Sequence, residues 1–570
     1  MSSLVVLILL IHSLLAYRIL ETDYGSIRGV DYITQAGFKG ELYKQIPYAV
    51  PPVGDLRYRK PQPAKKWNRT IDGTVFGPSC AQRTAHHTDY PSGTSEDCLH
   101  LNVYTSQGCR KELCPVIYYI HEGVVVIDTP IMYPDELLVH NFPYREVVLV
   151  TVGYRLGPFG VLSLGDENVL PSNLALHDAL AGLYFTRSQI HYFGGDKHKI
   201  TIMGDSSGGT MAAAIAFSPG ISPPGEPYLF NGVALMSSPD AIYPAEKQME
   251  RSRRYARQLK CEGSAREVVD CLRNKTTEEM LEAQLIVGGD DIMDDKNIQG
   301  LTLTGELLPI QTTCELFKNT RAFRLIAGTT IAEMDFSGSK DRVLGKNEVL
   351  DLLGVKNKDE CYAKYFTDRA TGFFKPGYSS RSQGIIMMTY LCALEAAKVG
   401  GEVYLYQYDY PVHPNHVDDL SYILGTRTFD KDSSEQFLSR VFPVYFTNFA
   451  KGLAPASDWE KVELGVMNYY SVNKSYEDGI SPAMKLGYQA NLGNYYIGEI
   501  IPFDEKMSTH KRNKSSIVLY HALPLTIPTQ KNTSVIVISG VILSAICVFG
   551  VFVVQNQQTK AERQPLLVRN

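Results

Sequence analysis

The sequence predicts an α/β fold, in which a large, mostly parallel sheet is flanked by helices. From about residue 115 onward, short runs rich in β-branched residues alternate with stretches whose apolar residues recur at helical spacing. Residues 17–525 contain no internal repeat and no long low-complexity linker, so we expect one large domain there. The expected elements are strands at 116–120, 147–152, 325–328 and 403–408, and a helix at 174–190.

The composition is that of an ordinary globular protein. The chain of 570 residues is 44% hydrophobic and 21% charged, and its net charge is −5. Neither a long basic run nor an alternation of basic and aromatic residues points to nucleic acid, so we set that class of partner aside. The sequence shows no cysteine–histidine spacing typical of a metal site, and we expect neither a metal nor a cofactor.

Both ends of the chain carry apolar segments. Residues 4–16 resemble the apolar core of a signal peptide, although no Lys or Arg precedes them, and a retained anchor is the alternative. Residues 534–554 contain no charge, and a helix of that length spans about 30 Å, enough for one membrane crossing. We therefore predict a single-pass type I membrane protein. Its predicted parts are a signal peptide at 1–16, an extracellular or lumenal domain at 17–525, a stalk at 526–533, the span at 534–554 and a cytoplasmic tail at 555–570.

The predicted tail contains a sorting motif. Glu562 precedes the pair Leu566 and Leu567 at the spacing of an acidic dileucine signal, which endosomal adaptors read. The motif suggests a sorting adaptor as a partner and makes endosomal or lysosomal delivery a hypothesis.

Ten cysteines in a lumenal chain permit disulfides. Cys80 and Cys98 flank a polar loop, and we expect them to pair. Cys261 and Cys271 bracket a short segment and form a second expected pair. A third small loop could be closed by Cys109 and Cys114, whereas no partner is assigned to Cys314, Cys361, Cys392 or Cys547.

Several asparagines begin N-x-S/T sequons, which suit a secreted surface. The sequon at Asn532 lies too close to the predicted membrane span to be a good acceptor. The expected glycosylation sites are Asn68, Asn274, Asn473 and Asn513.

The pentapeptide at 204–208, Gly-Asp-Ser-Ser-Gly, reads G-x-S-x-G. It follows an apolar run at 200–203 that predicts a strand, and small residues that predict a helix follow it. A sharp turn between a strand and a helix presents a nucleophilic serine, and the turn leaves no room for side chains on both flanks. The frame is unambiguous, because only Ser206 has glycine both two residues before it and two residues after it.

A serine hydroxyl attacks only when a base takes its proton, and the base is usually a histidine held by a carboxylate. In mostly parallel sheets that present a serine on a sharp turn between a strand and a helix, the chain order is serine, acid, histidine. The base must therefore follow Ser206. His416 opens a loop after the expected strand at 403–408, where a catalytic loop should emerge. The other downstream histidines are His413, His510 and His521, of which the last two lie in the polar approach to the predicted membrane span.

Four longer motifs add to this pattern: IPYAVPPVGDLR at 46–57, EDCLHLNVY at 96–104, YRLGP at 154–158 and FGGD at 193–196. Together with the serine motif they resemble the type-B carboxylesterases, a family that includes cholinesterases, bile-salt lipases and the non-catalytic neuroligins. The resemblance covers nearly all of residues 20–500. It implies an α/β-hydrolase fold and a serine esterase that acts on carboxylic esters.

The resemblance also implies the remaining triad residues. It places the acid at Glu333, although Met334 stands where the family has glycine, and Asp335 is the runner-up. It places the base at His416, with Val417 where the family has glycine. The implied catalytic triad is Ser206, Glu333 and His416.

The chain departs from the family at the oxyanion loop, where the family sequence H-G-G-G reads His-Glu-Gly-Val at 121–124. Val124 is β-branched and would be strained at positive φ. Glu122, if ionised beside the pocket, would oppose a developing oxyanion, so we expect it to face away from Ser206. A lost donor would slow the reaction about 100- to 1000-fold. The implied oxyanion donors are the backbone N–H groups of Gly123, Val124 and Ser207.

Other matched residues are predicted to hold the fold. Arg57 with Glu96, and Arg155 with Asp178, resemble buried ion pairs of the family. Breaking such a pair should unfold the protein rather than inactivate it selectively, because a lone buried charge costs several kcal/mol.

The leading hypothesis is a membrane-anchored serine carboxylesterase with an acyl-enzyme on Ser206. An acyltransferase would pass the same acyl group to an alcohol or sugar, and the triad does not separate the two. A neuroligin-like adhesion protein is favoured by the altered oxyanion loop and disfavoured by the serine motif. A cholinesterase is disfavoured, because neither Trp67 nor Trp459 lies in the loop that carries the choline-stacking tryptophan of that group.

Overall fold

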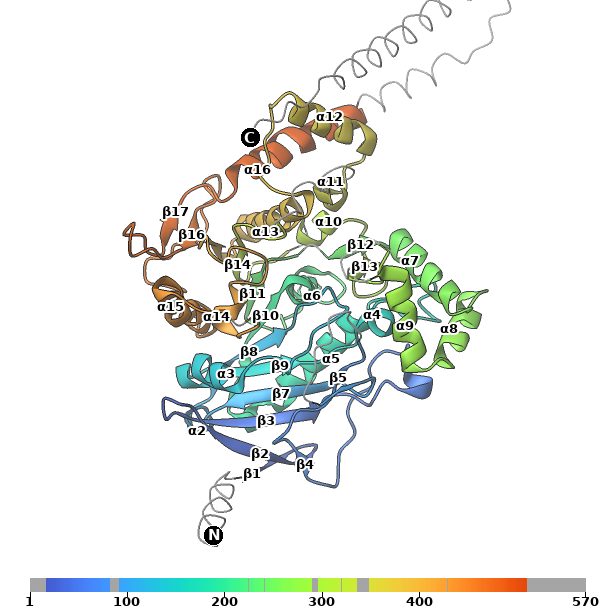
Figure 1. Ribbon diagram of the computed structural model, residues 1–570, viewed down its shortest axis with the longest axis vertical. Helices are drawn as coiled ribbons and strands as arrows, with labels where there is room; N and C mark the ends of the chain where they lie inside the picture. Colours follow the sequence, from blue (N-terminus) through green and yellow to red (C-terminus); the bar gives the residue numbers. More distant parts are fainter. Residues whose placement is uncertain are drawn as a thin grey trace, which may run out of the picture. The chain divides into compact units, whose positions relative to one another are not determined.

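The computed structural model describes residues 17–82, 92–223, 225–239, 241–289, 296–318, 320–335, 348–427 and 429–509 (Figure 1). A compact unit that ends at Met507 contains nearly all of them. In the described ranges, no helix is long and apolar enough to cross a membrane. Outside these ranges lie the predicted signal peptide at 1–16, residues 510–525 of the predicted domain, the stalk at 526–533, the span at 534–554, the tail at 555–570, Asn513, Leu566 and Leu567.

One sheet of thirteen strands forms the centre of the fold. Its strands are β1 (Tyr17–Thr22), β2 (Gly25–Ile33), β3 (Lys39–Pro47), β4 (Ile71–Asp72), β7 (His100–Thr105), β8 (Cys114–Ile120), β9 (Val148–Val152), β10 (Gly195–Asp205), β11 (Gly232–Met236), β14 (Arg324–Thr330), β15 (Glu402–Tyr408), β16 (Tyr469–Val472) and β17 (Ala483–Lys485). The order across the sheet is β1-β2-β3-β7-β9-β8-β10-β11-β14-β15-β16-β17, with β4 beside β2. Strands from β9 to β16 in this order are parallel, and the path becomes antiparallel at both ends. The predicted parallel centre is therefore confirmed.

Two small sheets and a set of helices complete the unit. The small sheets pair β12 (Ile242–Pro244) with β13 (Leu301–Leu303) and β5 (Ser79–Cys80) with β6 (Thr94–Ser95). The α-helices are α2 (Gln107–Lys111), α3 (Asp135–Asn141), α4 (Gly157–Gly160), α5 (Leu174–Gln189), α6 (Ser206–Phe217), α7 (Ala245–Gln258), α8 (Ala265–Arg273), α9 (Thr277–Gly288), α10 (Thr313–Lys318), α11 (Glu348–Leu353), α12 (Lys358–Ala370), α13 (Ser380–Lys398), α14 (Leu420–Ile423), α15 (Ser433–Ala450) and α16 (Ala490–Tyr495). Short 3-10 helices lie at Gly54–Leu56, Pro143–Arg145 and Ile190–Phe193, and a π-helix at Tyr496–Ile500 follows α16. Each strand and helix expected from the sequence falls within or overlaps an observed one.

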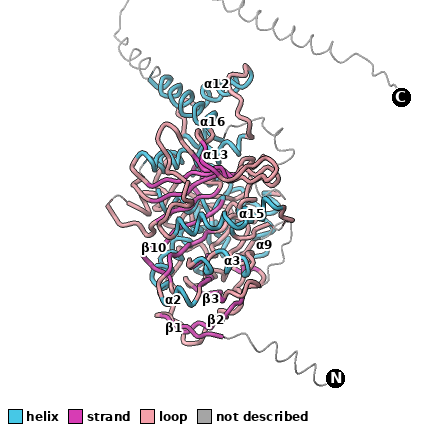
Figure 2. The backbone as a smooth tube through the Cα atoms, turned by 90° about the vertical axis from the view of Figure 1, so that its left-hand side faces the viewer, coloured by secondary structure: helices cyan, strands magenta, loops and turns pink. Residues whose placement is uncertain are grey.

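Helices bury both faces of the sheet, and the alternation of side chains along each strand explains how. In β8, Val116, Tyr118 and Ile120 join one hydrophobic core, to which α5 and α6 also contribute. The intervening residues Ile117 and Tyr119 join a second core with residues of α3, α14 and α15. A strand buried on both faces reads as a continuous apolar run, which is what the sequence shows at 116–120. Figure 2 shows the strands (magenta) among the helices (cyan).

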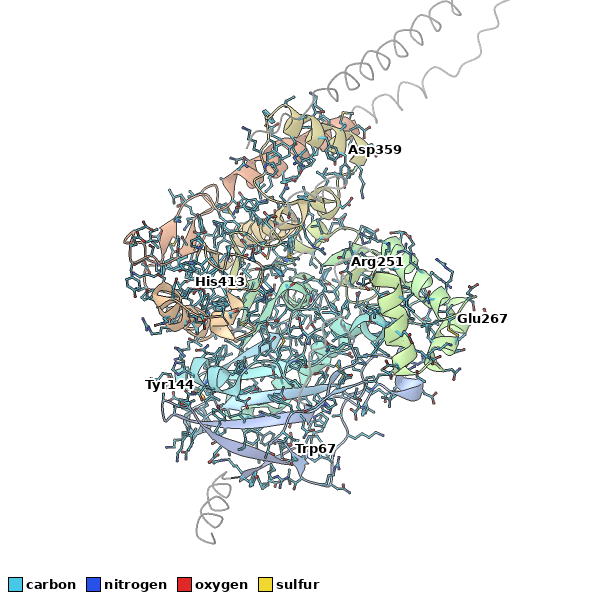
Figure 3. All side chains as sticks on the ribbon, in the orientation of Figure 1. Trp67, Tyr144, Arg251, Glu267, Asp359 and His413 are labelled. Carbon is cyan, nitrogen blue, oxygen red and sulfur yellow. A yellow bond between two sulfur atoms is a disulfide. The ribbon has the colours of Figure 1, made fainter. Side chains whose placement is uncertain are left out.

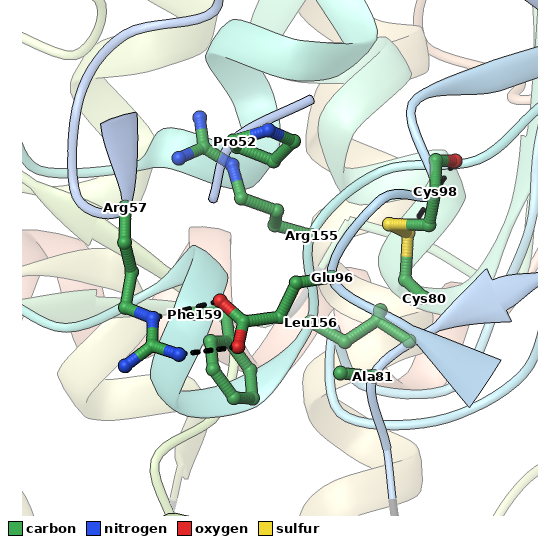
Figure 4. A pocket seen from close by; sticks show the side chains of 9 residues that line it. All are labelled: Pro52, Arg57, Cys80, Ala81, Glu96, Cys98, Arg155, Leu156 and Phe159. Atoms are coloured by element: carbon green, nitrogen blue, oxygen red, sulfur yellow. Dashed lines mark hydrogen bonds and ion pairs between the residues drawn. A yellow bond between two sulfur atoms is a disulfide. The ribbon is translucent and has the colours of Figure 1, made fainter. Parts of the chain in front are cut away.

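Both predicted ion pairs are present: Arg155 and Asp178 are both buried, whereas buried Arg57 meets a partly buried Glu96. Arg57 binds the carboxylate of Glu96 through Nε and Nη2 at 2.7 and 2.5 Å. Arg155 binds Asp178 through Nε and Nη2, both at 2.7 Å. The first pair borders a small pocket, to which no triad residue contributes. Its lining is Pro52, Arg57, Cys80, Ala81, Glu96, Cys98, Arg155, Leu156 and Phe159 (Figure 4).

Three disulfides tie neighbouring segments together. The structure joins Cys80 to Cys98 and Cys261 to Cys271, the two expected pairs. It also joins Cys109 to Cys114, the third loop that the sequence allowed. Three of the unassigned cysteines are buried free thiols: Cys314, Cys361 and Cys392.

The sequons inside the described residues differ in exposure. Asn68 and Asn274 are exposed, as a glycan requires. Asn473 is half-buried, and its Oδ1 is buried without a hydrogen-bond partner among the described residues. Glycosylation at these three positions stays a prediction, and it is less readily accommodated at Asn473.

The two tryptophans pack against neighbouring aromatic rings. Trp67, which is labelled in Figure 3, stacks on Tyr24 and donates from Nε1 to the carbonyl oxygen of Ser26 at 3.0 Å. Trp459 is buried and stacks on Tyr470 with the ring centroids 4.5 Å apart. Packing within the fold therefore accounts for both side chains.

Candidate active site

Ser206 lies at the turn between β10 and α6. Its φ is 52°, a left-handed conformation that residues other than glycine rarely adopt. A Cβ atom on Gly204 would lie 2.4 Å from the carbonyl carbon of Gly208, and one on Gly208 would lie 2.1 Å from the carbonyl oxygen of Ile120. Only glycine fits at either position, which is the physical reason for the G-x-S-x-G pattern.

The three predicted triad side chains form one chain of hydrogen bonds. Nε2 of His416 is 2.9 Å from Oγ of Ser206, and Nδ1 of His416 is 2.6 Å from Oε2 of Glu333. Glu333 lies in the loop after β14 and His416 in the loop after β15, two strands that are neighbours in the sheet. Because parallel strands end at the same edge, these loops meet the turn that carries Ser206.

A neighbouring hydroxyl and a backbone N–H group hold Glu333 in place. Its Oε1 accepts hydrogen bonds from Oγ of Ser237 and from the backbone N–H of Thr330, both at 2.8 Å. The runner-up acid, Asp335, is bound elsewhere: its Oδ1 accepts from the backbone N–H of Ser379 at 2.9 Å and from Oγ of Ser382 at 3.1 Å. The structure thus brings Glu333, and not Asp335, to the histidine.

A valine follows His416 in a conformation that suits glycine. The φ of Val417 is 74°, and a β-branched residue in the left-handed region costs about 1–2 kcal/mol. The backbone N–H of His416 donates to the carbonyl oxygen of Glu333 at 2.8 Å, which fixes this segment against the acid loop. The departure from the family motif is therefore accommodated as local strain.

The oxyanion loop follows β8 and has the strain expected at Val124. Gly123, Val124 and Val125 have φ angles of 99°, 51° and 60°. The carbonyl oxygen of Gly123 accepts from the N–H of Val126 at 2.8 Å, and that of Val124 accepts from the N–H of Gly300 at 3.0 Å. Among the described residues, the N–H groups of Gly123 and Val124 meet no backbone acceptor. They are available to a ligand oxygen.

Ser207 connects this loop to the serine turn. It is the second residue of α6, where a backbone N–H has no acceptor within the helix. Its Oγ accepts a hydrogen bond from the backbone N–H of Val125 at 3.1 Å. The three predicted oxyanion donors therefore belong to two segments that are in contact.

Glu122 is buried, with only 3% of its surface exposed. Its Oε2 accepts hydrogen bonds from the hydroxyls of Tyr119 at 2.7 Å and Tyr133 at 2.9 Å, partners that the sequence did not suggest. Burial raises the pKa of Glu122, while these hydroxyls and the nearby His416 act in the opposite direction. A raised pKa opposes ionisation, so Glu122 disfavours a neighbouring oxyanion less than a permanently charged group would.

Further buried carboxyls lie around the triad. Asp205 is fully buried, burial raises its pKa, and neither carboxyl oxygen has a hydrogen-bond partner in the part of the chain that is described. Burial and the charge of Glu333 raise the pKa of Asp419 to about 7. Burial and the charge of Glu122 raise the pKa of Asp128 to about 7.

Sequence reasoning did not single out these acids or the Ser237 and Thr330 contacts to Glu333. For two of the acids the position in the sequence could have indicated a place near the triad: Asp205 directly precedes Ser206, and Asp419 lies three residues after His416. In the described ranges, no group of three or more His, Cys, Asp or Glu side chains could hold a metal ion.

Asp128→Asn is expected to reduce the loss of stability as the pH rises from 5 to 8. The carboxyl of Asp128 has a pKa of about 7 in the folded protein, against an ordinary pKa of 3.8. It therefore stabilises the fold fully below pH 3.8, and this contribution is lost as the pH rises through 7. The asparagine variant should therefore gain about 1–3 kcal/mol over wild type between pH 5 and pH 8.

The measurement is urea unfolding at both pH values. Burial lowers the pKa of His121 to about 3 and that of His177 to about 4. Their protonation therefore lowers the stability as the pH falls, but only below their ordinary pKa of 6.5. An equal change in the free energy of unfolding of the variant and the wild type from pH 5 to pH 8 would show that Asp128 is already ionised in the folded protein.

Comparisons with known proteins give the family of the chain. The sequence profile described as the carboxylesterase family matches residues 16–491, and the chain belongs to that family. The chain is 36% identical over 269 residues to a carboxylic ester hydrolase of Bombus ignitus, covering 45% of each chain. It is 37% identical over 213 residues to the para-nitrobenzyl esterase of Bacillus subtilis, covering 36% of this chain and 41% of that one.

A third relative is matched over a longer stretch at lower identity. Liver carboxylesterase 1 of Oryctolagus cuniculus is 26% identical over 499 residues, which cover 77% of this chain and 86% of the relative. The chain spans less than half the length of the first two relatives in these matches.

Proposed function

We propose that this protein is a serine hydrolase of carboxylic esters. The observation that carries the proposal is the 2.9 Å contact between Nε2 of His416 and Oγ of Ser206, with Glu333 on the opposite ring nitrogen. Membership of the carboxylesterase family and the ester hydrolases among its relatives support the same reaction class.

The geometry suits a two-step reaction. In the first step, His416 takes the proton of the Ser206 hydroxyl as Oγ bonds to the ester carbonyl carbon. The ester C–O bond then breaks, His416 gives the proton to the leaving alcohol, and the acyl group remains on Ser206. In the second step His416 takes a proton from a water molecule as the water oxygen bonds to the acyl carbon. The bond between the acyl carbon and Oγ of Ser206 then breaks, the acid leaves, and His416 returns the proton to Oγ. Glu333 holds the ring orientation and stabilises the positively charged imidazole.

Negative charge on the carbonyl oxygen needs donors in both steps. The backbone N–H groups of Gly123, Val124 and Ser207 are the proposed donors. Two of them have no backbone acceptor in the described loop, and the third is at the start of α6, where the helix dipole also favours negative charge.

Glu333→Gln is expected to lower kcat by about 1000- to 10,000-fold, because an amide disfavours the required tautomer and stabilises the charged imidazole less. Asp335→Asn is the matched control, since Asp335 binds Ser379 and Ser382 instead. It should change kcat by less than about 10-fold. Steady-state hydrolysis of 4-nitrophenyl butyrate by both variants measures this, and a larger loss from Asp335→Asn would reassign the acid.

The strained oxyanion loop is the observation for which acyl transfer and adhesion are kept as alternative functions. Acyl transfer would use the same acyl group on Ser206, so added alcohol tests it: a new ester that increases at the expense of the free acid identifies a transferase. An adhesion protein of this fold would show no Ser206-dependent turnover of any ester.

We also propose that the domain acts in an extracellular or lumenal compartment and is anchored by residues 534–554. Three disulfides and the exposed sequons at Asn68 and Asn274 support the compartment. Extraction of cell membranes with carbonate tests the anchor. Full-length protein should stay with the membrane, and a chain truncated at residue 531 should be released; release of both would reject the anchor.

A further inference from the structure

The oxyanion loop contains a run of strained backbone that needs support. Residues 123–125 all have left-handed φ angles, and only the first of them is glycine. Val124 and Val125 are β-branched, and this conformation is unfavourable for such residues without tertiary contacts. An isolated loop with this sequence would relax, and its N–H groups would turn away from a common point. The surrounding structure must therefore hold the loop.

Glu122 immediately precedes this run and is firmly attached. Its Oε2 accepts from the Tyr119 hydroxyl at the end of β8 and from the Tyr133 hydroxyl in the segment before α3. The two rings pack edge to face, with centroids 5.6 Å apart and an interplanar angle of 82°. All three side chains are buried. Two hydroxyls from different segments donate to the same buried carboxyl oxygen and so fix its position.

The loop is also held at two other points. The ring of His121 stacks on Tyr154 with centroids 4.2 Å apart, and the Tyr154 hydroxyl donates to the carbonyl oxygen of His121 at 2.7 Å. Beyond the strained run, the N–H of Val125 donates to Oγ of Ser207 at 3.1 Å. Of the side chains in this loop, that of Glu122 is the one placed directly before Gly123, the first donor.

We propose that Glu122 is a positioning residue for ester hydrolysis: held by Tyr119 and Tyr133, it keeps Gly123 and Val124 in the conformation in which their N–H groups receive the oxyanion. The inference rests on the proposed function. It also gives a reason for a glutamate where the family motif has glycine. A loop with glycine at position 124 adopts the left-handed conformation freely, whereas a loop with valine there needs an anchor.

A double-variant experiment in the full-length protein tests this role. Glu122→Ala should lower kcat for 4-nitrophenyl butyrate by about 100-fold, the size of one lost oxyanion donor, with KM changed by less than about 3-fold. Tyr119→Phe/Tyr133→Phe, which removes only the two hydroxyls, should lower kcat in the same direction. In a Val124→Gly background the loss caused by Glu122→Ala should shrink to less than about 5-fold, because glycine needs no anchor.

Glu41→Ala is the matched control. Glu41 is also buried and also accepts a hydrogen bond from a tyrosine, Tyr43, at 3.1 Å. It lies in β3, which β7, β9 and β8 separate from β10 in the sheet. This variant should lower the melting temperature without lowering kcat per folded molecule. The inference is overturned if Glu122→Ala keeps wild-type kcat, or if its loss is the same in both backgrounds.

Crystal structures of the variants provide a readout that does not depend on turnover. In Glu122→Ala the φ of Val124 should leave the left-handed region, and in Glu122→Ala/Val124→Gly residue 124 should stay there. An inactive wild-type protein would reject the proposed function, and an unchanged φ at Val124 in Glu122→Ala would reject the anchor. The two failures are therefore distinguishable.

Discussion

Replacing Ser206 with alanine is expected to abolish ester hydrolysis. The rate of 4-nitrophenyl butyrate hydrolysis should fall by roughly four orders of magnitude or more, to the background level. The physical reason is that Ser206 is the nucleophile in contact with His416, and alanine leaves no atom to bond to the acyl carbon. Binding should be largely preserved, because the variant removes a single oxygen atom.

The neighbouring serine supplies the control. Ser207→Ala keeps its backbone N–H, the proposed oxyanion donor, and loses only the Oγ contact to the N–H of Val125. Its rate should fall by no more than about 10-fold, about 1.4 kcal/mol, which is the scale of one hydrogen bond. If Ser207→Ala were the inactive variant and Ser206→Ala the active one, the reading frame of the G-x-S-x-G motif would be wrong.

Breaking the Arg155–Asp178 pair should destabilise the fold and leave the chemistry intact. Asp178 is fully buried, Arg155 is nearly so, and Asp178 also accepts from the backbone N–H of Arg155 at 3.1 Å. Arg155→Met leaves that carboxylate without its partner, at an expected loss of about 3–5 kcal/mol in the free energy of unfolding. Urea unfolding measures the loss, and kcat per folded molecule should stay near wild type.

An exposed ion pair provides the comparison for this variant. Arg254 binds Glu250 at 2.8 Å on the surface of α7, and Arg254→Met should cost less than about 0.5 kcal/mol. An equal cost for the two variants would show that burial does not set the importance of the Arg155–Asp178 pair. A loss of kcat in folded Arg155→Met would assign that arginine a role in the reaction.

Short-range patterns explain why much of this structure could be predicted. The apolar run at 116–120 indicated a strand, and β8 divides its side chains between two cores. The glycines at 204 and 208 indicated a turn too tight for a Cβ atom, and the contacts at Gly204 and Gly208 are that tight. The strain expected at Val124 is present in its φ angle.

Contacts between distant segments explain what the sequence could not supply. Choosing between Glu333 and Asp335 required the positions of Ser237 and of Ser379, which lie far from both in the chain. Tyr133, eleven residues after Glu122, reaches its carboxylate only because the chain folds back before α3. These partners lie outside the short motifs in which the acids were recognised.

The pKa shifts belong to the same group of unpredicted properties. Asp419 follows a recognisable histidine motif, yet its pKa of about 7 depends on burial and on the charge of Glu333, which comes from another loop. Residue type and spacing identify an acid, whereas packing around it decides its protonation.

Mass spectrometry of the acyl-enzyme tests the central claim most directly. Wild-type protein turning over 4-nitrophenyl acetate is quenched with acid, digested and compared with Ser206→Ala treated in the same way. We predict an acetyl group on the peptide that contains Ser206, and none on that peptide in the variant. Turnover without this adduct, or an acetyl group that persists on the peptide of the alanine variant, would contradict covalent catalysis at Ser206.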